Sequence, residues 1–170
     1  MPTENERKYM LRLDCEPQIR KVALGKQTIR QGYLIAARGT TVRVRSVNNG
    51  KTTYWLTLKC NNGRRCIEVE NKLDKRDFED LWELSMNRLE KTRYKLPDGW
   101  CVDFFLDHDD TTYFAMAECE MPEDQLEPKW TPEVITKALT FTVPATDQRF
   151  SSKLVSDVRY AKNLFKECSS

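Results

Sequence analysis

Pairs of charged side chains two residues apart recur along the chain, alternating with apolar or small residues. Side chains two apart on a β-strand point to the same face, so each pair would present its charges together. One such strand is common in any sheet with one solvated face, whereas the same charge pattern in seven strands is unusual. The charged pairs are Glu4 and Glu6, followed by Lys8; Arg43 and Arg45; Glu68 and Glu70; Lys91 and Arg93; and Glu118 and Glu120. Lys59, with Thr57 two residues before it, and Asp103 are single charges that alternate with apolar residues in the same way.

Like charges on one face repel unless opposite charges, metal ions or an anion lie across from them. Acidic and basic strands occur in similar number here, and a face that carries both suits a polyanion bridged by divalent cations. Arginine and lysine bind phosphate oxygens, while carboxylates bind the metal. Because carboxylates are the clustered ligands, the pattern predicts a hard, oxygen-seeking ion such as Mg²⁺ or Mn²⁺.

Two other readings remain open at this point. A barrel that captures polyphosphate or a nucleotide without turnover would need the basic residues, but it would gain nothing from carboxylates that face its ligand. A structural protein would turn all these charges outward to water. The acidic set therefore favours catalysis over simple capture.

The cysteines and the histidine do not predict a zinc site. The six cysteines form no C-x-x-C pair, and the single histidine, His108, lies in an acidic loop. Cys60 and Cys66 flank Asn61-Asn62-Gly63 and could form a disulfide across a hairpin, but reduced thiols are the favoured interpretation for a cytosolic chain.

Length and composition limit the class of protein. The 170 residues predict a single domain, 1–170, and the net charge of +2 argues against a nucleic-acid partner. No apolar run approaches the roughly 20 residues of a membrane span, so no membrane partner is expected. The acidic, polar N-terminus does not resemble a secretory signal, and the expected location is the cytoplasm.

Most of the chain has the alternation of short strands, which would form a largely antiparallel sheet with a few covering helices, a mainly β (α+β) class. Closing this sheet into a barrel would turn the charged faces inward and remove its edges. Strands are expected over residues 4–13, 28–36, 41–47, 52–60, 65–70, 89–96, 100–106 and 113–121. Helices are expected over residues 74–89, 134–139 and 151–167, the first capped by Asp74.

The charged positions fall within motifs that resemble those of the CYTH superfamily, the triphosphate tunnel metalloenzymes. Glu4-Asn5-Glu6-Arg7-Lys8 is similar to the E-x-E-x-K signature of that family. Further motifs follow in the family's order: Gln31-Gly32-Tyr33-Leu34, Arg43-x-Arg45, Leu56-Thr57-Leu58-Lys59, Glu68-x-Glu70, Lys91-Thr92-Arg93-Tyr94, Trp100-Cys101-Val102-Asp103, Ala117-Glu118-Cys119-Glu120 and Asp147-Gln148-Arg149-Phe150.

The resemblance implies a closed eight-stranded antiparallel tunnel that binds a triphosphate-containing small molecule. It implies metal-dependent hydrolysis of inorganic triphosphate, with Glu4, Glu6, Lys8, Glu118 and Glu120 in catalytic roles. Substrate-binding positions would be Lys8, Arg43, Arg45, Lys59, Lys91, Arg93 and Arg149. Metal positions would be Glu4, Glu6, Glu68, Glu70, Asp103, Glu118 and Glu120.

Other members of the family act on thiamine triphosphate or nucleoside triphosphates, or cyclise ATP as class IV-type adenylate cyclases. These activities are the alternatives within the family, and the expected state is a monomer or homodimer. Several positions depart from the family pattern. Cys101 replaces an acid in the tryptophan motif, Cys66 stands where an arginine is expected, and Phe150 and Ser152 replace a tyrosine and an asparagine.

Overall fold

The computed structural model describes residues 5–61 and 66–169, without the side chains of Asn61 and Cys66. It is mainly β, with antiparallel strand pairs and short helices, as the alternation of the sequence predicts. The chain divides into two compact units. Unit 1 is Gln27–Glu90, and unit 2 is residues 5–26 together with residues 91–169. The prediction of one domain over 1–170 stays a prediction.

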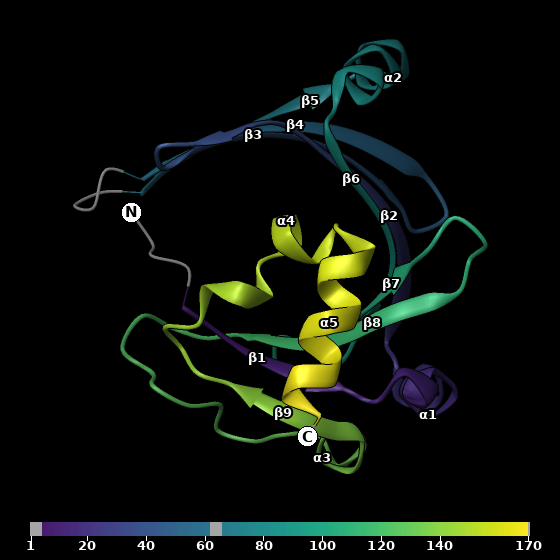
Figure 1. Ribbon diagram of the computed structural model, residues 1–170, viewed down its shortest axis with the longest axis vertical. Helices are drawn as coiled ribbons and strands as arrows, with labels where there is room; N and C mark the ends of the chain where they lie inside the picture. Colours follow the sequence, from purple (N-terminus) through teal and green to yellow (C-terminus); the bar gives the residue numbers. More distant parts are fainter. Residues whose placement is uncertain (1–4, 62–65, 170) are drawn as a thin grey trace. The chain divides into compact units, whose positions relative to one another are not determined.

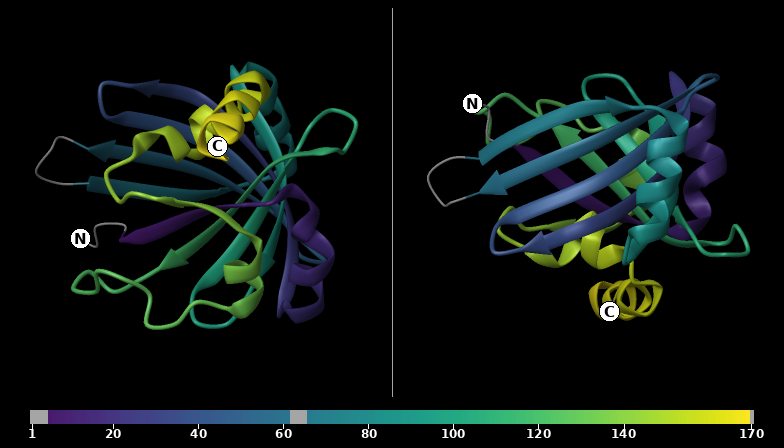
Figure 2. Two further views of the ribbon diagram at one scale, coloured as in Figure 1. Left: turned by 60° about the horizontal axis from the view of Figure 1, so that its bottom comes forward. Right: turned by 90° about the horizontal axis from the view of Figure 1, so that it is seen from above.

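Unit 1 is an antiparallel meander, and Figure 2 shows its strands as successive hairpins. Its strand order is β5-β4-β3-β2-β6, in which β6 contributes its first residues. Gly39 and Gly50 take positive φ values of 76° and 108° in two of the hairpin turns, as the turn residues predict. The elements are β2 (Gly25–Ala37), β3 (Thr40–Asn48), β4 (Thr52–Asn61), β5 (Cys66–Leu73), α2 (Lys75–Leu84) and β6 (Asn87–Lys95).

Helix α2 covers the apolar face of β3 and β4, which leaves the opposite face of unit 1 for charged side chains (Figure 1). Asp74 caps the helix by accepting a hydrogen bond from Asp77 N, as predicted. The core beneath it contains Val44, Phe78 and Trp82. The close approach of the helix end to β2 requires Gly32, because a Cβ atom there would lie 2.8 Å from Ser85 Cβ.

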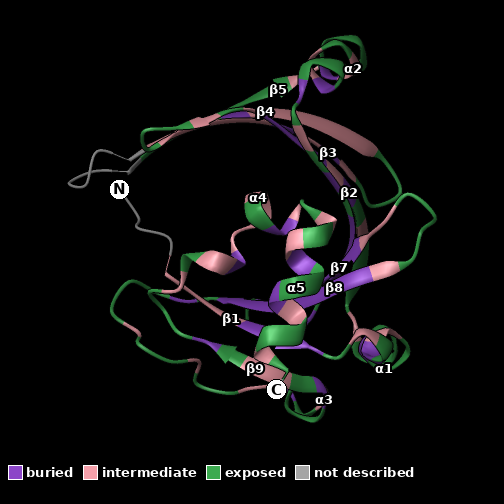
Figure 3. Cartoon of the chain, viewed as in Figure 1, coloured by how far each residue is buried: buried purple, intermediate pink, exposed green. Residues whose placement is uncertain are grey.

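Unit 2 has the strand order β6-β7-β8-β1-β9, in which β6 contributes its last residues. Strands β7 and β8 are mostly buried (Figure 3). The elements are β1 (Glu6–Leu11), a 3₁₀ turn (Leu13–Cys15), α1 (Glu16–Val22), β7 (Trp100–Leu106), β8 (Thr112–Glu120), α3 (Glu133–Ala138), β9 (Leu139–Val143), a second 3₁₀ turn (Gln148–Phe150), α4 (Ser152–Val155) and α5 (Val158–Cys168).

The two faces of the unit 2 strands are both covered, but differently. One face packs Tyr9, Trp100 and Phe104 with residues of α1 and α3 in the main hydrophobic core. On the other face α5 lies across β8, and Phe165 of α5 meets Phe114 edge to face at 6.3 Å between ring centroids (Figure 1). The aromatic cover occupies only one end of this second face, and the charged residues occupy the other.

Several predicted boundaries are wrong. The helix expected over residues 74–89 ends at Leu84, and Leu89 lies in β6, because the apolar spacing that suggested a helix stripe continues into a strand. The tail helix is broken into α4 and α5, since Asp157 accepts a hydrogen bond from Tyr160 N and starts a new helix. The described residues form nine strands where eight were expected, because β9 was not predicted.

The other structural expectations concern cysteines and membranes. Cys60 is a free thiol with its Sγ 3.8 Å from Thr40 Oγ1, while the side chain of Cys66 lies outside the described residues. Cys60 pairs with Ile67 in the β4–β5 register. Within the described part of the chain, no helix has the length and apolar character needed to cross a membrane.

Candidate functional site

The charged residues of unit 2 lie on one face because of the strand register. Glu6 in β1 lies opposite Glu120 in β8, and Lys8 lies opposite Glu118. On the other side of β8, Cys101 of β7 is also opposite Glu118. Directly opposed residues of antiparallel strands share a face. The alternation in the sequence therefore places these side chains together as predicted.

Lys91 and Arg93 of β6 converge on Asp103 of β7. Lys91 Nζ donates to Asp103 Oδ2 at 2.6 Å, and Arg93 donates to both carboxylate oxygens, through Nε at 2.6 Å and Nη2 at 2.7 Å. The Asp103 side chain is fully buried, and that of Lys91 is 2% exposed. A buried carboxylate with three donors on its two oxygens is a structural anchor for both cations.

Arg93 also links this anchor to Glu118. Its Nη2 donates to Glu118 Oε2 at 3.0 Å, and the thiol of Cys101 lies 3.9 Å from the same oxygen. The guanidinium is therefore shared between two carboxylates. Its side chain remains 19% exposed, so it borders solvent while Lys91 does not.

The pKa values of this group follow from burial and from the ion pairs. Burial opposes ionisation of Asp103, but Lys91 and Arg93 outweigh it and lower the pKa of Asp103 to about 2. Burial lowers the pKa of Lys91 despite Asp103. Burial, reinforced by Asp103, raises the pKa of Glu118, although the two cations oppose this. Burial also raises the pKa of Cys101 to about 12, so its thiol stays protonated at neutral pH.

A second group of carboxylates lies at the β1–β8 end of the same face. Glu6 is opposite Glu120, and Lys8 Nζ lies 2.9 Å from Glu6 Oε1. Like charges directly opposite each other are unfavourable unless a cation compensates them. Carboxylate oxygens are the ligands that a hard divalent cation such as Mg²⁺ or Mn²⁺ prefers. Within the described residues, however, the group of three whose ligand atoms lie within 4.8 Å of one another is Asp107, His108 and Asp109, so the metal role of Glu6, Glu118 and Glu120 stays a prediction. Glu4, predicted to join them, lies outside the described residues.

Unit 1 carries its own charged face, opposite the face under α2. The β2–β3 register places Gln31 opposite Arg45 and Tyr33 opposite Arg43. Gln31 Oε1 accepts from Arg45 Nε at 2.8 Å, and Gln31 Nε2 donates to the Tyr33 hydroxyl at 2.6 Å. Arg43 Nε is buried and makes no hydrogen bond to any described residue. The two arginines of β3 thus face neutral side chains of β2, and Gln31 holds Arg45 by a hydrogen bond.

The acidic residues of β5 face the same way. Glu68 lies 3.9 Å from Arg43 Nη2 and 4.0 Å from Lys59 Nζ, and Glu70 accepts from the buried hydroxyl of Thr57 at 3.0 Å. Both glutamates are exposed and serve here as partners of the basic residues. They lie in unit 1, while the other predicted metal residues that the structure describes lie in unit 2.

Arg149 is in a different setting from the cations of β6. Its Nη2 lies 2.8 Å from Asp147 Oδ2, and its Nη1 lies 3.3 Å from Glu167 Oε1 of α5. The hydrogen bond from Arg149 lowers the pKa of Asp147. Arg149 thus lies in the 3₁₀ turn before α4 and contacts the C-terminal end of α5, with 43% of its side chain exposed.

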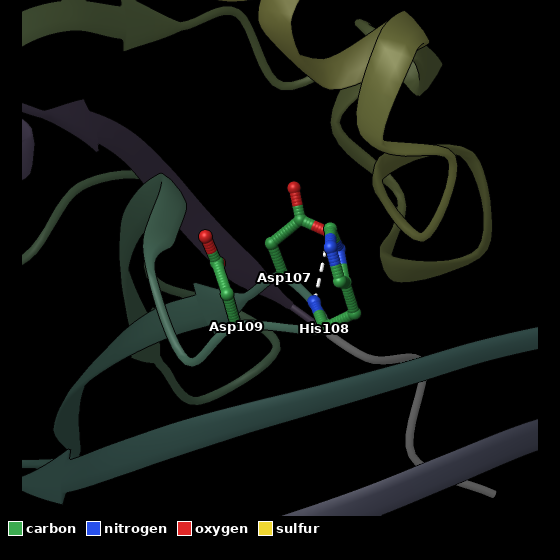
Figure 4. Close-up of side chains that lie close together, drawn as sticks. All are labelled: Asp107, His108 and Asp109. Atoms are coloured by element: carbon green, nitrogen blue, oxygen red, sulfur yellow. Dashed lines mark hydrogen bonds and ion pairs between the residues drawn. The ribbon is translucent and has the colours of Figure 1, made fainter.

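A surface group in the β7–β8 turn also brings titratable side chains together. Asp107, His108 and Asp109 offer ligand atoms within 4.8 Å of one another (Figure 4). Asp107 Oδ1 accepts from the His108 backbone and lies 2.8 Å from His108 Nδ1, and its other oxygen lies 3.5 Å from Lys162 Nζ. Asp107 already accepts hydrogen bonds from His108 and pairs with Lys162, and His108 is exposed. We therefore interpret this group as a turn stabilised by hydrogen bonds.

The chain was also compared with known proteins. No family model matches it. It is 33% identical over 159 residues to the inorganic triphosphatase of Nitrosomonas europaea, and the alignment covers 84% of this chain and 99% of that relative. The chain belongs to the inorganic triphosphatase family of the CYTH superfamily. The resemblance seen in the motifs is thereby confirmed.

Solved structures agree with this membership in the CYTH superfamily. The crystal structure of the inorganic triphosphatase NE1496 matches with a TM-score of 0.58 and 28% identity over 92% of this chain and 95% of that one. The PH1819 protein from Pyrococcus horikoshii matches with a TM-score of 0.50 and 16% identity over 98% of this chain and 90% of that one, which shows a common fold.

For this CYTH chain, sequence reasoning missed how Gln31 is used. Gln31 appeared only as part of a family motif, although it is 1% exposed and bonded to a predicted phosphate ligand. A polar residue in an alternating strand, directly opposite an arginine, was the available signal.

Proposed function

We propose that the chain hydrolyses inorganic triphosphate with the help of Mg²⁺ or Mn²⁺. The observation that carries the proposal is the shared face of β1, β6 and β8, where the register sets Glu6 opposite Glu120 and Lys8 opposite Glu118, and Arg93 of β6 contacts Glu118. Carboxylates suit a divalent cation and the cations suit phosphate oxygens, so one face offers ligands for both. Membership of the inorganic triphosphatase family supports the same substrate.

Phosphoryl transfer requires positioning and charge neutralisation more than covalent chemistry from the protein. In the proposed mechanism Lys8 and Arg93 bind phosphate oxygens and stabilise charge that develops on the bridging oxygen. Arg43, Arg45 and Lys59 of unit 1 contribute further phosphate contacts, with Arg149 and Lys91 as the remaining basic positions. A divalent cation bound by the glutamates would polarise the phosphate and lower the pKa of the attacking water.

The glutamates have separate tasks in this mechanism. Glu6 and Glu120 are proposed as direct metal ligands because they lie at the more open end of the face. Glu4 is proposed as a further ligand on the family motif alone. Glu118 is proposed to bind metal while holding Arg93. Glu68, Glu70 and Asp103 are the further acidic positions of the family pattern, acting directly or through water.

The finer features implied by the resemblance belong to the same proposal. They are a closed tunnel that surrounds the triphosphate, a cytoplasmic location and a monomeric or homodimeric state. A triphosphate-containing small molecule is the proposed partner, without nucleic acid or membrane. Thiamine triphosphate, nucleoside triphosphates and cyclisation of ATP remain the alternatives within the family.

A phosphate-release assay tests the proposal. Inorganic triphosphate, ATP and thiamine triphosphate are compared with Mg²⁺, Mn²⁺ or EDTA, and cyclic AMP is measured in parallel. We expect fastest phosphate release from inorganic triphosphate with metal and none with EDTA. Tight binding of triphosphate without release under any metal condition would instead establish a binding module.

A further inference from the structure

We propose that Gln31 is a positioning residue that fixes the guanidinium of Arg45 for phosphate binding and itself adds no charge. The inference rests on the proposed function, in which Arg45 binds a phosphate. Its basis is one partly buried contact within unit 1: Gln31 Oε1 accepts a hydrogen bond from Arg45 Nε at 2.8 Å. The two residues are directly opposed in the β2–β3 register, so the strands themselves set this distance.

The orientation of the Gln31 amide is determined by its second contact. Its Nε2 group donates to the hydroxyl of Tyr33 at 2.6 Å, which leaves the carbonyl end of the amide toward Arg45. Arginine can only donate, so the reverse orientation of the amide would set two donors against each other. Gln31 is 1% exposed and Tyr33 is 6% exposed, so water could not easily repair such a mismatch.

The choice of a neutral acceptor has an electrostatic consequence. Arg93 in unit 2 is oriented by Asp103 and Glu118, two carboxylates that oppose its charge. Gln31 engages only Nε of Arg45 and adds no charge. Fixing Nε fixes the plane of the guanidinium, and hence the directions in which its two Nη groups point. Because the arginine is already oriented, its side chain loses less conformational entropy when an anion binds.

The contact is tested by the affinity for inorganic triphosphate, measured calorimetrically in EDTA. Gln31→Met removes the acceptor at similar size, and we expect it to weaken binding about 5- to 10-fold, the effect of one lost hydrogen bond. Gln31→Glu keeps an acceptor but cancels the charge of Arg45, and we expect weaker binding than in Gln31→Met. Ser46→Ala, on the opposite face of β3 beside Arg45, is the matched control and should bind as wild type.

A double-mutant cycle separates positioning from general damage to the fold. If Gln31 acts through Arg45, Gln31→Met should change affinity less than about twofold in an Arg45→Met background. With Mg²⁺ present, the single variant should raise KM for triphosphate more than it lowers kcat. Equal weakening by Gln31→Met in both backgrounds, or wild-type affinity of the single variant, would overturn the inference.

A readout that needs no catalysis keeps this inference distinct from the proposed function. The Arg45 Nε–H resonance, assigned by its loss in Arg45→Lys, should exchange slowly with water in the wild type and rapidly in Gln31→Met. An unchanged resonance would show that Gln31 does not hold Arg45. If the wild type releases no phosphate from triphosphate, the proposed function fails, and the resonance still decides the Gln31–Arg45 contact.

Discussion

Lys91 and Asp103 form a buried ion pair between β6 and β7, with Nζ 2.6 Å from Oδ2 and side-chain exposures of 2% and 0%. Arg93 completes the group by donating to both oxygens of the same carboxylate. The pair was expected from sequence to touch phosphate and metal separately. In the structure Lys91 and Asp103 form an ion pair with each other, and Arg93 is the member of the group whose side chain remains partly exposed.

Removing the Asp103 charge should therefore destabilise the protein. Asp103→Asn leaves Lys91 and Arg93 without their shared carboxylate, and we expect a loss of about 3–5 kcal/mol in the free energy of unfolding, measured with urea. Adding Lys91→Met removes one of the buried uncompensated charges, so the double variant should be more stable than Asp103→Asn alone. A single variant as stable as wild type would contradict the buried network.

Glu6 offers a test of the metal-binding end of the face. Glu6→Gln should abolish metal-dependent release of phosphate from triphosphate while leaving the thermal midpoint nearly unchanged, because Glu6 is partly exposed and its ion pair with Lys8 contributes little. Glu133→Gln is the matched control, since Glu133 is 80% exposed in α3 and pairs with Lys137 on the helix surface. Wild-type turnover of Glu6→Gln with Mg²⁺ would refute the metal assignment.

The packing of α2 against β2 predicts a difference between two glycines of the same strand. Gly32→Ala places a Cβ atom 2.8 Å from Ser85 Cβ, and we expect it to lower the free energy of unfolding by about 1–3 kcal/mol. Gly25→Ala has no heavy atom within 4 Å of the new Cβ and should have little effect. Equal stability of the two variants in urea unfolding would show that α2 does not pack this closely.

His108 should titrate above its ordinary value, because it is hydrogen-bonded to Asp107 and lies near Asp109, and both raise its pKa above 6.5. As the single histidine it gives one set of ring signals in an NMR titration. Asp107→Asn should lower this pKa, and Asp110→Asn should leave it unchanged. The favourable interaction is present below pH 6.5 and lost as pH rises through the folded-state pKa. A pKa that Asp107→Asn does not lower would contradict the contact.

Alternation was the reliable guide to the strands and to their faces. Glu118 and Glu120 share a face with Glu6 and Lys8 because a two-residue repeat fixes side-chain direction in any strand. Local chemistry also located the start of α2, since Asp74 is a good N-cap. These features depend on near neighbours in the chain, and sequence reasoning could therefore find them.

The missed features depend on partners far along the chain or on weak local signals. Helix α1 buries only Ile19, so it has no apolar stripe, and Pro17 in its first turn was its one marker. Strand β9 is only five residues long and follows α3 directly. The engagement of Asp103 by both cations of β6 could not be predicted, because strand alternation gives a face but not the order in which charges on that face pair.

Asp103 is the one charged residue of β7, and the next residue on its face is aromatic. Asp103 and Phe105 share a face, and beyond Asp103 the rings of Phe105, Phe114 and Phe150 succeed one another at about 6 Å between centroids. A linear chain of phosphates that followed this row would meet ring carbon where it needs a donor. If the chain hydrolyses triphosphate as proposed, further phosphates would find no hydrogen-bond donor on these rings, and we expect short phosphate chains to bind better than long polymers.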